Sequence, residues 1–314
     1  MPVYGWKGQI GWGEETTWGT AATINRFERF ISESIEREQP PIFVPVVTGS
    51  RSRPQELYLQ GLQRIGGEIV FPVWAKGLGL WFKHALGSVS STQPDPNVWL
   101  HTFTPTDTLP AGLTIEVGRV TQFHKYAGCR VNELTIRAAP GEDPRLTIAV
   151  LGKSETIAGT GATASFPSGN QILQTALATF TIDGVSTSIY EFEVRISNNL
   201  RDDAFVLGDS TRASLDPQAR EVTGRFRLPY DAVAQYQKFI NFTTAALNIK
   251  LIGGTISGTY KFTLEVDLPV VIYEGRTPTV GGAEEEIVLE VPFRAVKGTS
   301  PEVTIKYQNN ESAP

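Results

Sequence analysis

The residues that could do chemistry are few, and their spacing fits no catalytic or metal-binding pattern. The three histidines, His84, His101 and His124, have no cysteine or acidic partners at metal-ligand spacing, so we expect them to be packed or surface residues. Cys129 is the only cysteine, which excludes an intrachain disulfide and a cysteine-cluster metal site. The sequence therefore predicts no catalytic residues, no metal and no cofactor.

Two glycine-containing segments resemble nucleotide-binding motifs, and neither fits. The run "GKS" at 152–154 ends like a phosphate-binding loop, but that pattern needs a glycine where Thr147 stands. The glycines between residues 5 and 13 do not follow a strand within a βαβ unit, so they do not make a dinucleotide site.

The N-terminal segment alternates these glycines with Trp6, Trp12 and Trp18. Such a pattern predicts an extended arm whose tryptophans dock on a neighbouring subunit, because large aromatic side chains dominate interface energetics. The alternative is an arm that is tied to its own domain.

Composition restricts the function classes. The chain has 314 residues, 40% hydrophobic and 19% charged, which is enough for about two globular domains. Its net charge is −5 and it has no basic block, which argues against binding of nucleic acid through phosphate neutralisation. No segment approaches the roughly 20 apolar residues of a membrane span, and the N-terminus has no basic region followed by an apolar run. We expect a protein made and kept in a cytosol.

The chain repeats itself. "RAAPGEDPRLTI" at 137–148 matches "RAVKGTSPEVTI" at 294–305, and "GGEIVFPVWA" from Gly67 matches "TGRFRLPYDA" from Gly224 at the same spacing. A third match, F-E-x-x-I-S, pairs 27–35 with 192–200 at a larger spacing. These matches predict a duplicated domain. The expected parts are an arm over 1–25, domains over 26–154 and 173–307, a Gly/Ser/Thr-rich linker over 155–172, and a tail over 308–314.

Each copy shows mostly strand patterns, with one helical segment at 75–88 or 231–243. The sequence therefore predicts a mainly β protein of two tandem sandwich or barrel domains, each with one packed helix. Short turn-rich connections, "APGEDP" and "VKGTSP", predict a tight hairpin at the end of each copy. Polar segments, "VVTGSRSRPQEL" at 46–57 and "VLGDSTRASLDPQ" at 206–218, predict a long loop between the first strands; long loops are usually functional.

Three segments carry a resemblance to a known family. These are "IGWGEETTWGTAA" leading into "FERFISESI", "GGEIVFPVWAKGLGLWFKHALG", and "YAGCRVNELTIRAAPGEDPRLTIAVLGK". In their arrangement they resemble the major tail tube proteins of long, non-contractile-tailed bacteriophages, of the two-domain type. The resemblance covers most of the first copy, and the second follows through the repeat.

The resemblance implies a structural virion protein rather than an enzyme. Subunits of this family form rings that stack into a hollow tube, through which double-stranded DNA passes without sequence-specific binding. Six tube domains per ring and two per chain predict a trimeric, pseudo-sixfold ring. The implied partners are further copies of the chain, a tape-measure protein, and tail terminator and tail-tip proteins, with no membrane. The implied location is the virion tail, after assembly in the host cytoplasm.

The resemblance also suggests roles for two groups of residues. The long loops would contact the adjacent ring through Arg51, Arg53, Asp209 and Arg212. The polar faces of the first strands would line the lumen through Ser32, Ser34, Glu36, Glu193, Arg195, Ser197 and Asn199. The alternative for these faces is contact with solvent or with a neighbouring sheet. A second function class, a carbohydrate-binding or adhesin-like β-sandwich with tryptophan stacking platforms, also stays open at this point.

Overall fold

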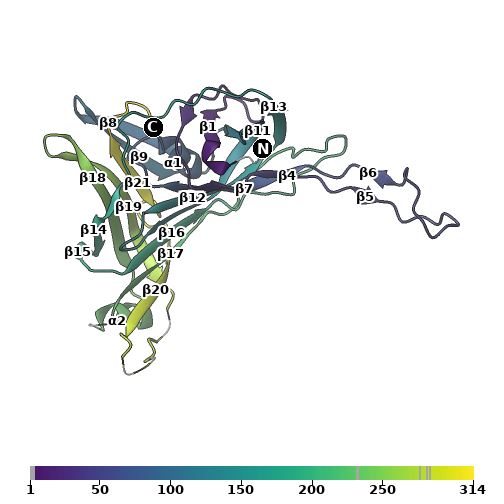
Figure 1. Ribbon diagram of the computed structural model, residues 1–314. Helices are drawn as coiled ribbons and strands as arrows, with labels where there is room; N and C mark the ends of the chain where they lie inside the picture. The colour runs from purple at the N-terminus through teal and green to yellow at the C-terminus, as the bar shows by residue number, and fades with distance from the viewer. Residues whose placement is uncertain (1–3, 231–232, 276, 281, 283) are drawn as a thin grey trace.

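The computed structural model describes residues 4–230, 233–275, 277–280, 282 and 284–314 as a β-rich body from which one long hairpin projects (Figure 1). The first half contains η1 (Gly5–Lys7), β1 (Gln9–Glu14), β2 (Arg26–Phe27), β3 (Ser32–Glu33), β4 (Glu36–Glu38), β5 (Ile42–Phe43), β6 (Tyr58–Leu59), β7 (Arg64–Pro72), α1 (Gly79–Leu86), β8 (Gly87–Asp95), β9 (Val98–Pro105), β10 (Leu113–Gly118), β11 (Phe123–Ala138), β12 (Arg145–Gly152) and β13 (Ser154–Ala158). The second half contains β14 (Gln174–Ile182), β15 (Val185–Ser186), β16 (Glu191–Ser197), β17 (Glu221–Pro229), α2 (Ala234–Ile240), β18 (Ala245–Ser257), β19 (Tyr260–Tyr273), β20 (Val288–Ala295) and β21 (Thr304–Asn309). The predicted mainly β fold with one helix in each half is confirmed.

Strand pairing follows the same order in the two halves. In the first half β10 pairs with β1 and β11, β11 pairs with β12 and β13, and β12 pairs with β7. In the second half β18 pairs with β14 and β19, β19 pairs with β20 and β21, and β20 pairs with β17. The strands before the long connections also correspond, because β3 and β4 pair with β7 as β16 pairs with β17.

The pairing registers support one of the three repeat matches and correct the other two. Gly67 lies on β7 opposite β12, and Gly224 lies on β17 opposite β20, as their match requires. The match of 137–148 with 294–305 instead aligns β12 with β21, which occupies a different place in the sheet. The third match also slips by several residues, since Glu33, rather than Phe27 as that match requires, holds the place of Phe192. Strands share a two-residue alternation, so short sequence matches between them do not fix the register.

The tight hairpin predicted at the end of each copy forms only in the first. β11 and β12 pair with each other, but β20 pairs with β17 and β19, whereas β21 pairs with β19 and β9. A turn-rich connection lets the chain reverse, but the side chains on the two strands decide which neighbours they take.

Two pairings join the halves into one body. β11 pairs with β16, so the sheet runs without a break in the order β3/β4, β7, β12, β11, β16, β17, β20 (Figure 1). The β8–β9 hairpin of the first half also pairs with β21 of the second. Apolar side chains on one side of this sheet belong to a single core.

From β1 onward the N-terminal segment is part of that core, which favours the alternative of an arm that is tied to its own domain over an arm docked on a neighbour. β1 pairs with β10, and Trp12 is fully buried with its ring centroid 5.0 Å from that of Trp81. The linker prediction is also only partly right, because β13, at its start, pairs with β11. Further along, Gln9 Nε2 donates a hydrogen bond to the Ala162 carbonyl at 2.8 Å.

Both helices are shorter than predicted, and they differ in burial. Trp81 and Phe82 on α1 are fully buried, and Phe82 contacts Phe103 on β9 with ring centroids 5.6 Å apart. No residue of α2 is buried. The first two residues of the predicted second helix, 231 and 232, lie outside the described part of the chain.

Candidate assembly surfaces

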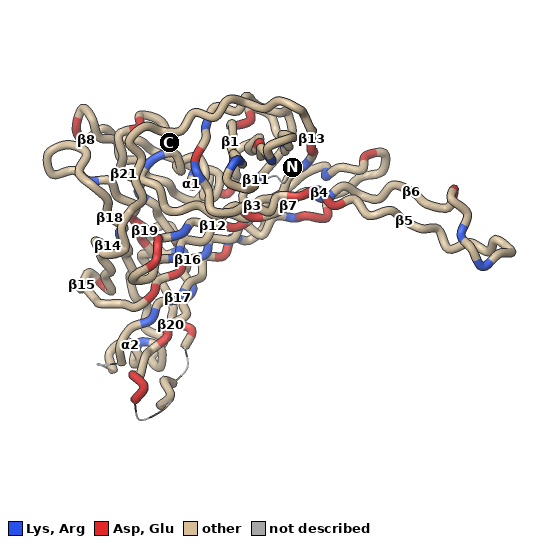
Figure 2. Tube along the Cα trace, viewed as in Figure 1, with Lys and Arg blue, Asp and Glu red and all other residues tan. Residues whose placement is uncertain are grey.

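The face of the continuous sheet that points away from the core carries a ladder of ion pairs across β11, β16, β17 and β20. Strand alternation buries Val194 and Ile196 and turns Glu193 and Arg195 to the other face. Arg195 pairs with Glu133 on β11. Figure 2 shows acidic and basic residues interleaved along these strands.

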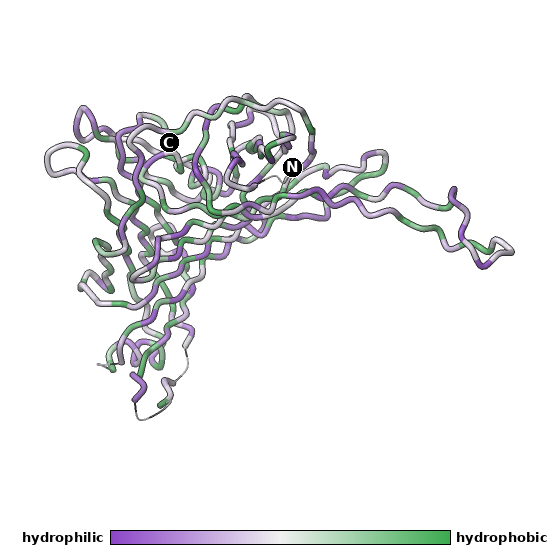
Figure 3. Tube along the Cα trace, viewed as in Figure 1, coloured by the Kyte–Doolittle hydropathy of each residue, from purple (hydrophilic) through white to green (hydrophobic). Residues whose placement is uncertain are grey.

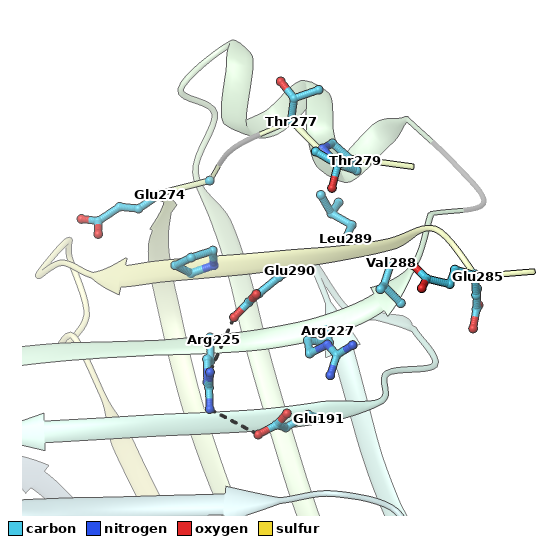
Figure 4. Close-up of a pocket in the computed structure, with 14 residues that line it drawn as sticks. Glu191, Arg225, Arg227, Glu274, Thr277, Thr279, Glu285, Val288, Leu289 and Glu290 are labelled. Atoms are coloured by element: carbon cyan, nitrogen blue, oxygen red, sulfur yellow. Dashed lines mark hydrogen bonds and ion pairs between the residues drawn. The ribbon is translucent and has the colours of Figure 1, made fainter. Parts of the chain in front are cut away.

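Arg225 is the centre of this ladder. Its guanidinium lies 3.1 Å from the Glu193 carboxylate, and it lies 3.5 Å from Glu191 and 3.6 Å from Glu290, as Figure 4 shows for the last two. One cation therefore joins three strands. The negative charge of Glu193 raises the pKa of Arg225 above its ordinary value. Since each acid on these strands has a basic neighbour, the face is nearly neutral, and it has no single-sign field that would attract or repel a polyanion strongly.

The structure places most of the predicted lining residues on this face. Ser32 and Glu36 lie opposite Val70 and Gly66, on the side away from the core, and both are exposed. Ser34 is exposed beside them, and its Oγ accepts a hydrogen bond from the Glu68 amide at 3.0 Å.

Two of the predicted lining residues are poorly placed. Ser197 is only 7% exposed, and its Oγ donates to Asn199 Oδ1 at 3.0 Å. Asn199 has a positive φ of 45° and donates from Nδ2 to the Ala219 carbonyl at 2.8 Å. These two side chains stabilise the turn after β16, so we assign them a structural role.

The sheet has two edges at which the described residues provide no strand partner. β3 and β4 pair with β7 alone. At the other end β20 pairs with β17 along its whole length, but with β19 only near its end, where Phe293 lies opposite Tyr273. The Glu274 amide adds one hydrogen bond to the Pro292 carbonyl at 2.7 Å, and beyond it an open pocket follows β20 (Figure 4). An unpaired edge is a template for another strand.

The long connection between β4 and β7 forms a hairpin over residues 39–62 (Figure 1). From here on, the arm means this hairpin and not the N-terminal segment. β5 and β6 pair with Ile42 opposite Leu59 and Phe43 opposite Tyr58. Seven apolar side chains of the arm are at least 40% exposed: Ile42, Phe43, Val46, Val47, Tyr58, Leu59 and Leu62. Figure 3 shows these apolar stretches along the projecting chain. The sequence prediction for this loop rested on the polar residues of its tip. The apolar run "PIFVPVV" at 41–47, just before them, is the sequence signal for the exposed apolar surface.

The four residues predicted for ring-to-ring contacts have different environments. Arg51 and Arg53 are exposed at the arm tip, and the Arg53 guanidinium lies 5.8 Å from the centre of the Phe43 ring. Asp209 is exposed and accepts a hydrogen bond from the Thr211 amide at 2.8 Å.

Arg212 is only 2% exposed, which removes it from the surface and corrects the prediction. Its Nη1 donates to the carbonyls of Ile65 and Gly152, both at 2.7 Å, and its Nε donates to the Asp202 carbonyl at 3.0 Å. The second long segment therefore folds back over the start of β7, while the first projects.

The tryptophans do not form a row of exposed platforms. Trp12 and Trp81 are buried, Trp18 donates to the Gly128 carbonyl at 3.0 Å, and Trp74 donates to the Arg29 carbonyl at 2.8 Å. Trp6 is 78% exposed and stays a candidate for contact with a neighbour. A glycan-binding surface built on stacked tryptophans has no support in this arrangement.

The histidines are structural residues. His84 is buried against Glu14, with 3.2 Å between Nε2 and Oε1, and this hydrogen bond lowers the pKa of Glu14 to about 2. His101 is buried and contacts Ser91 Oγ at 2.7 Å, and His124 contacts Glu155 at 2.8 Å. Across the described ranges, no group of three or more histidine, cysteine or acidic side chains is placed to hold a metal ion.

Comparisons with known proteins agree with this picture of a structural subunit. A family model described as phage tail tube protein matches residues 5–295, which is nearly the whole chain. A search of curated proteins gave no match. Within the part that the structure describes, no helix is long and apolar enough to cross a membrane. The chain, a mainly β subunit with open sheet edges, belongs to the phage tail tube protein family, whose members are non-enzymatic structural components of the virion tail.

Proposed function

We propose that three copies of this chain close into a pseudo-sixfold ring, and that rings stack into the hollow tube through which double-stranded DNA is ejected. The observation that carries the proposal is the junction between β11 and β16 inside one chain. At this junction the sheet of the first half continues into the sheet of the second half through a regular antiparallel pairing. Six such junctions, three within chains and three between them, would close one barrel.

The two open edges of the sheet would form the junction between neighbouring chains. β3 and β4 correspond to β16 and lack the partner that β11 provides for β16. The continuation of β19 beyond Tyr273 corresponds to the part of β11 that pairs with β16. Pairing the end of β19 in one chain with β3 and β4 of the next therefore repeats the internal junction, and closure leaves no free edge.

Electron microscopy of the concentrated purified protein tests the proposal. We expect long tubes with a central channel, and at high resolution three chains in each ring. A ring of six chains would overturn the trimer, and a protein that stays monomeric at high concentration would overturn the assembly itself.

The ladder face is the proposed lining of the lumen. In a barrel closed through these edges, one face of the sheet packs on the subunit cores and the other, with Glu36, Glu193 and Arg195, surrounds the channel. A nearly neutral lining suits passage of a polyanion, because phosphate neutralisation by the wall would slow its release.

Lysine substitutions at Glu36 and Glu193 test the lining. A chain with both Glu36→Lys and Glu193→Lys should still form tubes, but phage particles that carry it should eject DNA several-fold more slowly, because the added cations attract phosphates. Raising the salt concentration should reduce the difference. The matched control replaces both residues by glutamine, which removes the acids without adding cations. Equal ejection rates for the lysine and glutamine chains would exclude this face from the lumen.

The remaining parts of the proposal follow from the family. We propose two tube domains over 26–154 and 173–307, and the repeated pairing favours adding β1 to the first, since β1 pairs with β10 as β14 pairs with β18. The predicted tail over 308–314 begins inside β21, and the Glu311 carboxylate accepts a hydrogen bond from the Gly77 amide at 2.9 Å, which ties this segment to the body. The tube would enclose a tape-measure protein during assembly in the host cytoplasm and would end at terminator and tip proteins.

A further inference from the structure

The end of the body around α2 carries an apolar surface that the described chain leaves uncovered. We call this surface, formed by Val233, Ile240, Phe242, Val280, Glu284 and Glu285, the α2 end. Its four apolar side chains are 53%, 53%, 77% and 73% exposed. The helix is held to the chain that follows β19, where Tyr236 Oη lies 2.9 Å from Thr277 Oγ1.

Comparison with the first half shows what α2 lacks. Between α1 and β10 the chain inserts the β8–β9 hairpin, and Phe103 on β9 packs on Phe82 of α1. After α2 only four residues precede β18, and no hairpin is inserted. The two helices occupy matching places in the repeated pairing, so the covered helix predicts that the uncovered one has a partner from outside the chain.

Phe242 adds an independent observation. It adopts a positive φ of 52° while its ring is 77% exposed. A left-handed backbone is unfavourable for a phenylalanine. Within a single chain, the exposed ring buries too little apolar surface to offset this cost. Local strain of this kind clusters at active sites, ligand clamps and switch regions.

From these observations we infer that the α2 end is the docking site for the arm of a second copy of this chain in the adjacent ring. The inference rests on the proposed stacking of rings and names the two surfaces that make it. The arm is another exposed apolar surface of the described chain, with Phe43, Val46 and Val47 at least half exposed.

Charge fits this pairing. The arm tip carries Arg51 and Arg53, and the α2 end carries Glu284 and Glu285 (Figure 2). All four side chains are exposed, and none has an ion-pair partner among the described residues. Complementary charges at the rim of an apolar contact fix its register and its partner.

The placement of the two surfaces suits head-to-tail assembly. The arm leaves the sheet at the start of β7, whereas α2 follows the end of β17, and these two strands hold matching places in the sheet (Figure 1). The surfaces therefore lie at opposite ends of the strand direction. A contact between unlike surfaces at opposite ends propagates as an open filament.

A charge-reversal and rescue experiment tests the pairing. The chain with Arg51→Glu and Arg53→Glu should need at least about tenfold higher concentration to form tubes, because like charges meet at the contact. Adding Glu284→Arg and Glu285→Arg to the same chain should bring that concentration back near the wild-type value. Glu284→Arg and Glu285→Arg alone should be as defective as the first variant.

A second variant separates docking from folding. Phe242→Asn places a residue that tolerates positive φ at this position, so the melting temperature should stay equal or rise, while tube formation should again require at least about tenfold more protein. Unchanged tube formation, or a failed rescue in the charge experiment, would overturn the α2 end as the docking site even though wild-type tubes form. If the wild-type chain forms no tubes, the proposed function itself fails.

Discussion

A chain carrying Glu38→Cys and Glu274→Cys should run as a covalent trimer on a denaturing gel after oxidation of assembled tubes. Each chain contributes one cysteine to each neighbour in a closed ring, so three disulfides link three chains. The only native cysteine, Cys129, is buried and should not interfere.

The register of this pair comes from the internal junction. Glu133 on β11 lies opposite Ser197 on β16. Through β7 and β17, Glu38 holds the place of Ser197, because Arg64 lies opposite Glu38 as Glu221 lies opposite Ser197.

On the other edge, Glu274 holds the place of Glu133. Glu133 lies opposite Ala149 on β12, and Glu274 bonds through its amide to Pro292 on β20. Ala149 and Pro292 lie opposite matching positions of β7 and β17.

The internal junction also predicts suitable geometry for a disulfide. The Asn198 amide donates to the Asn132 carbonyl at 2.8 Å, so the neighbouring pair, Glu133 and Ser197, is of the non-hydrogen-bonded type. Such pairs have Cα atoms about 4.5 Å apart, within the range that disulfides span.

Matched controls make the result specific. Either single cysteine should give no trimer, and Glu36→Cys combined with Glu274→Cys, displaced by two residues, should cross-link poorly. Covalent hexamers would show a ring of six chains instead of three. Tubes that form normally but yield only unlinked chains would contradict pairing between these edges.

The second large effect concerns stability. Arg212→Ala should lower the free energy of unfolding by about 3 kcal/mol, because three carbonyls at the base of the arm lose a charged donor in a buried place. Burial lowers the pKa of Arg212, but its ordinary value is so high that the side chain stays charged. Chemical denaturation followed by fluorescence measures the change.

Two comparisons identify the cause. Arg212→Lys should recover only part of the loss, since one ammonium group does not reproduce the planar guanidinium, whose Nη1 reaches Ile65 and Gly152 while its Nε reaches Asp202. Arg51→Ala at the exposed arm tip should change stability by less than about 0.5 kcal/mol. Equal stabilities of the Arg212→Ala and Arg51→Ala chains would show that the buried hydrogen bonds contribute nothing.

Local pattern predicted many elements of this fold. The strand at 145–152 buries one face along its whole length, as the alternation of its sequence indicates. The spacing of Gly67 and Gly224 revealed corresponding strands. The sequence has no residues at the spacing of a catalytic or metal site, and its first half resembles tail tube proteins. Together these features predicted a structural protein.

Local sequence did not determine which side chains are buried or which groups they contact. Nothing near Arg212 in the sequence distinguishes it from Arg51, yet one is buried by carbonyls from β7 and β12 and the other projects into solvent. Trp12 and Trp6 differ in the same way, since only Trp12 lies on a strand that pairs with β10. The apolar surface of the α2 end also appears only when the helix is seen without a covering hairpin.

The sequence by itself determined the strand alternation, the duplication and the lack of chemistry, because these depend on residue types at short spacing. The tertiary structure decided which strand pairs with which, and so which edges and side chains stay free for another copy. Pairing depends on contacts between residues far apart in the chain. Two connections that share a glycine and a proline permitted a hairpin at β11–β12 and different partners at β20 and β21.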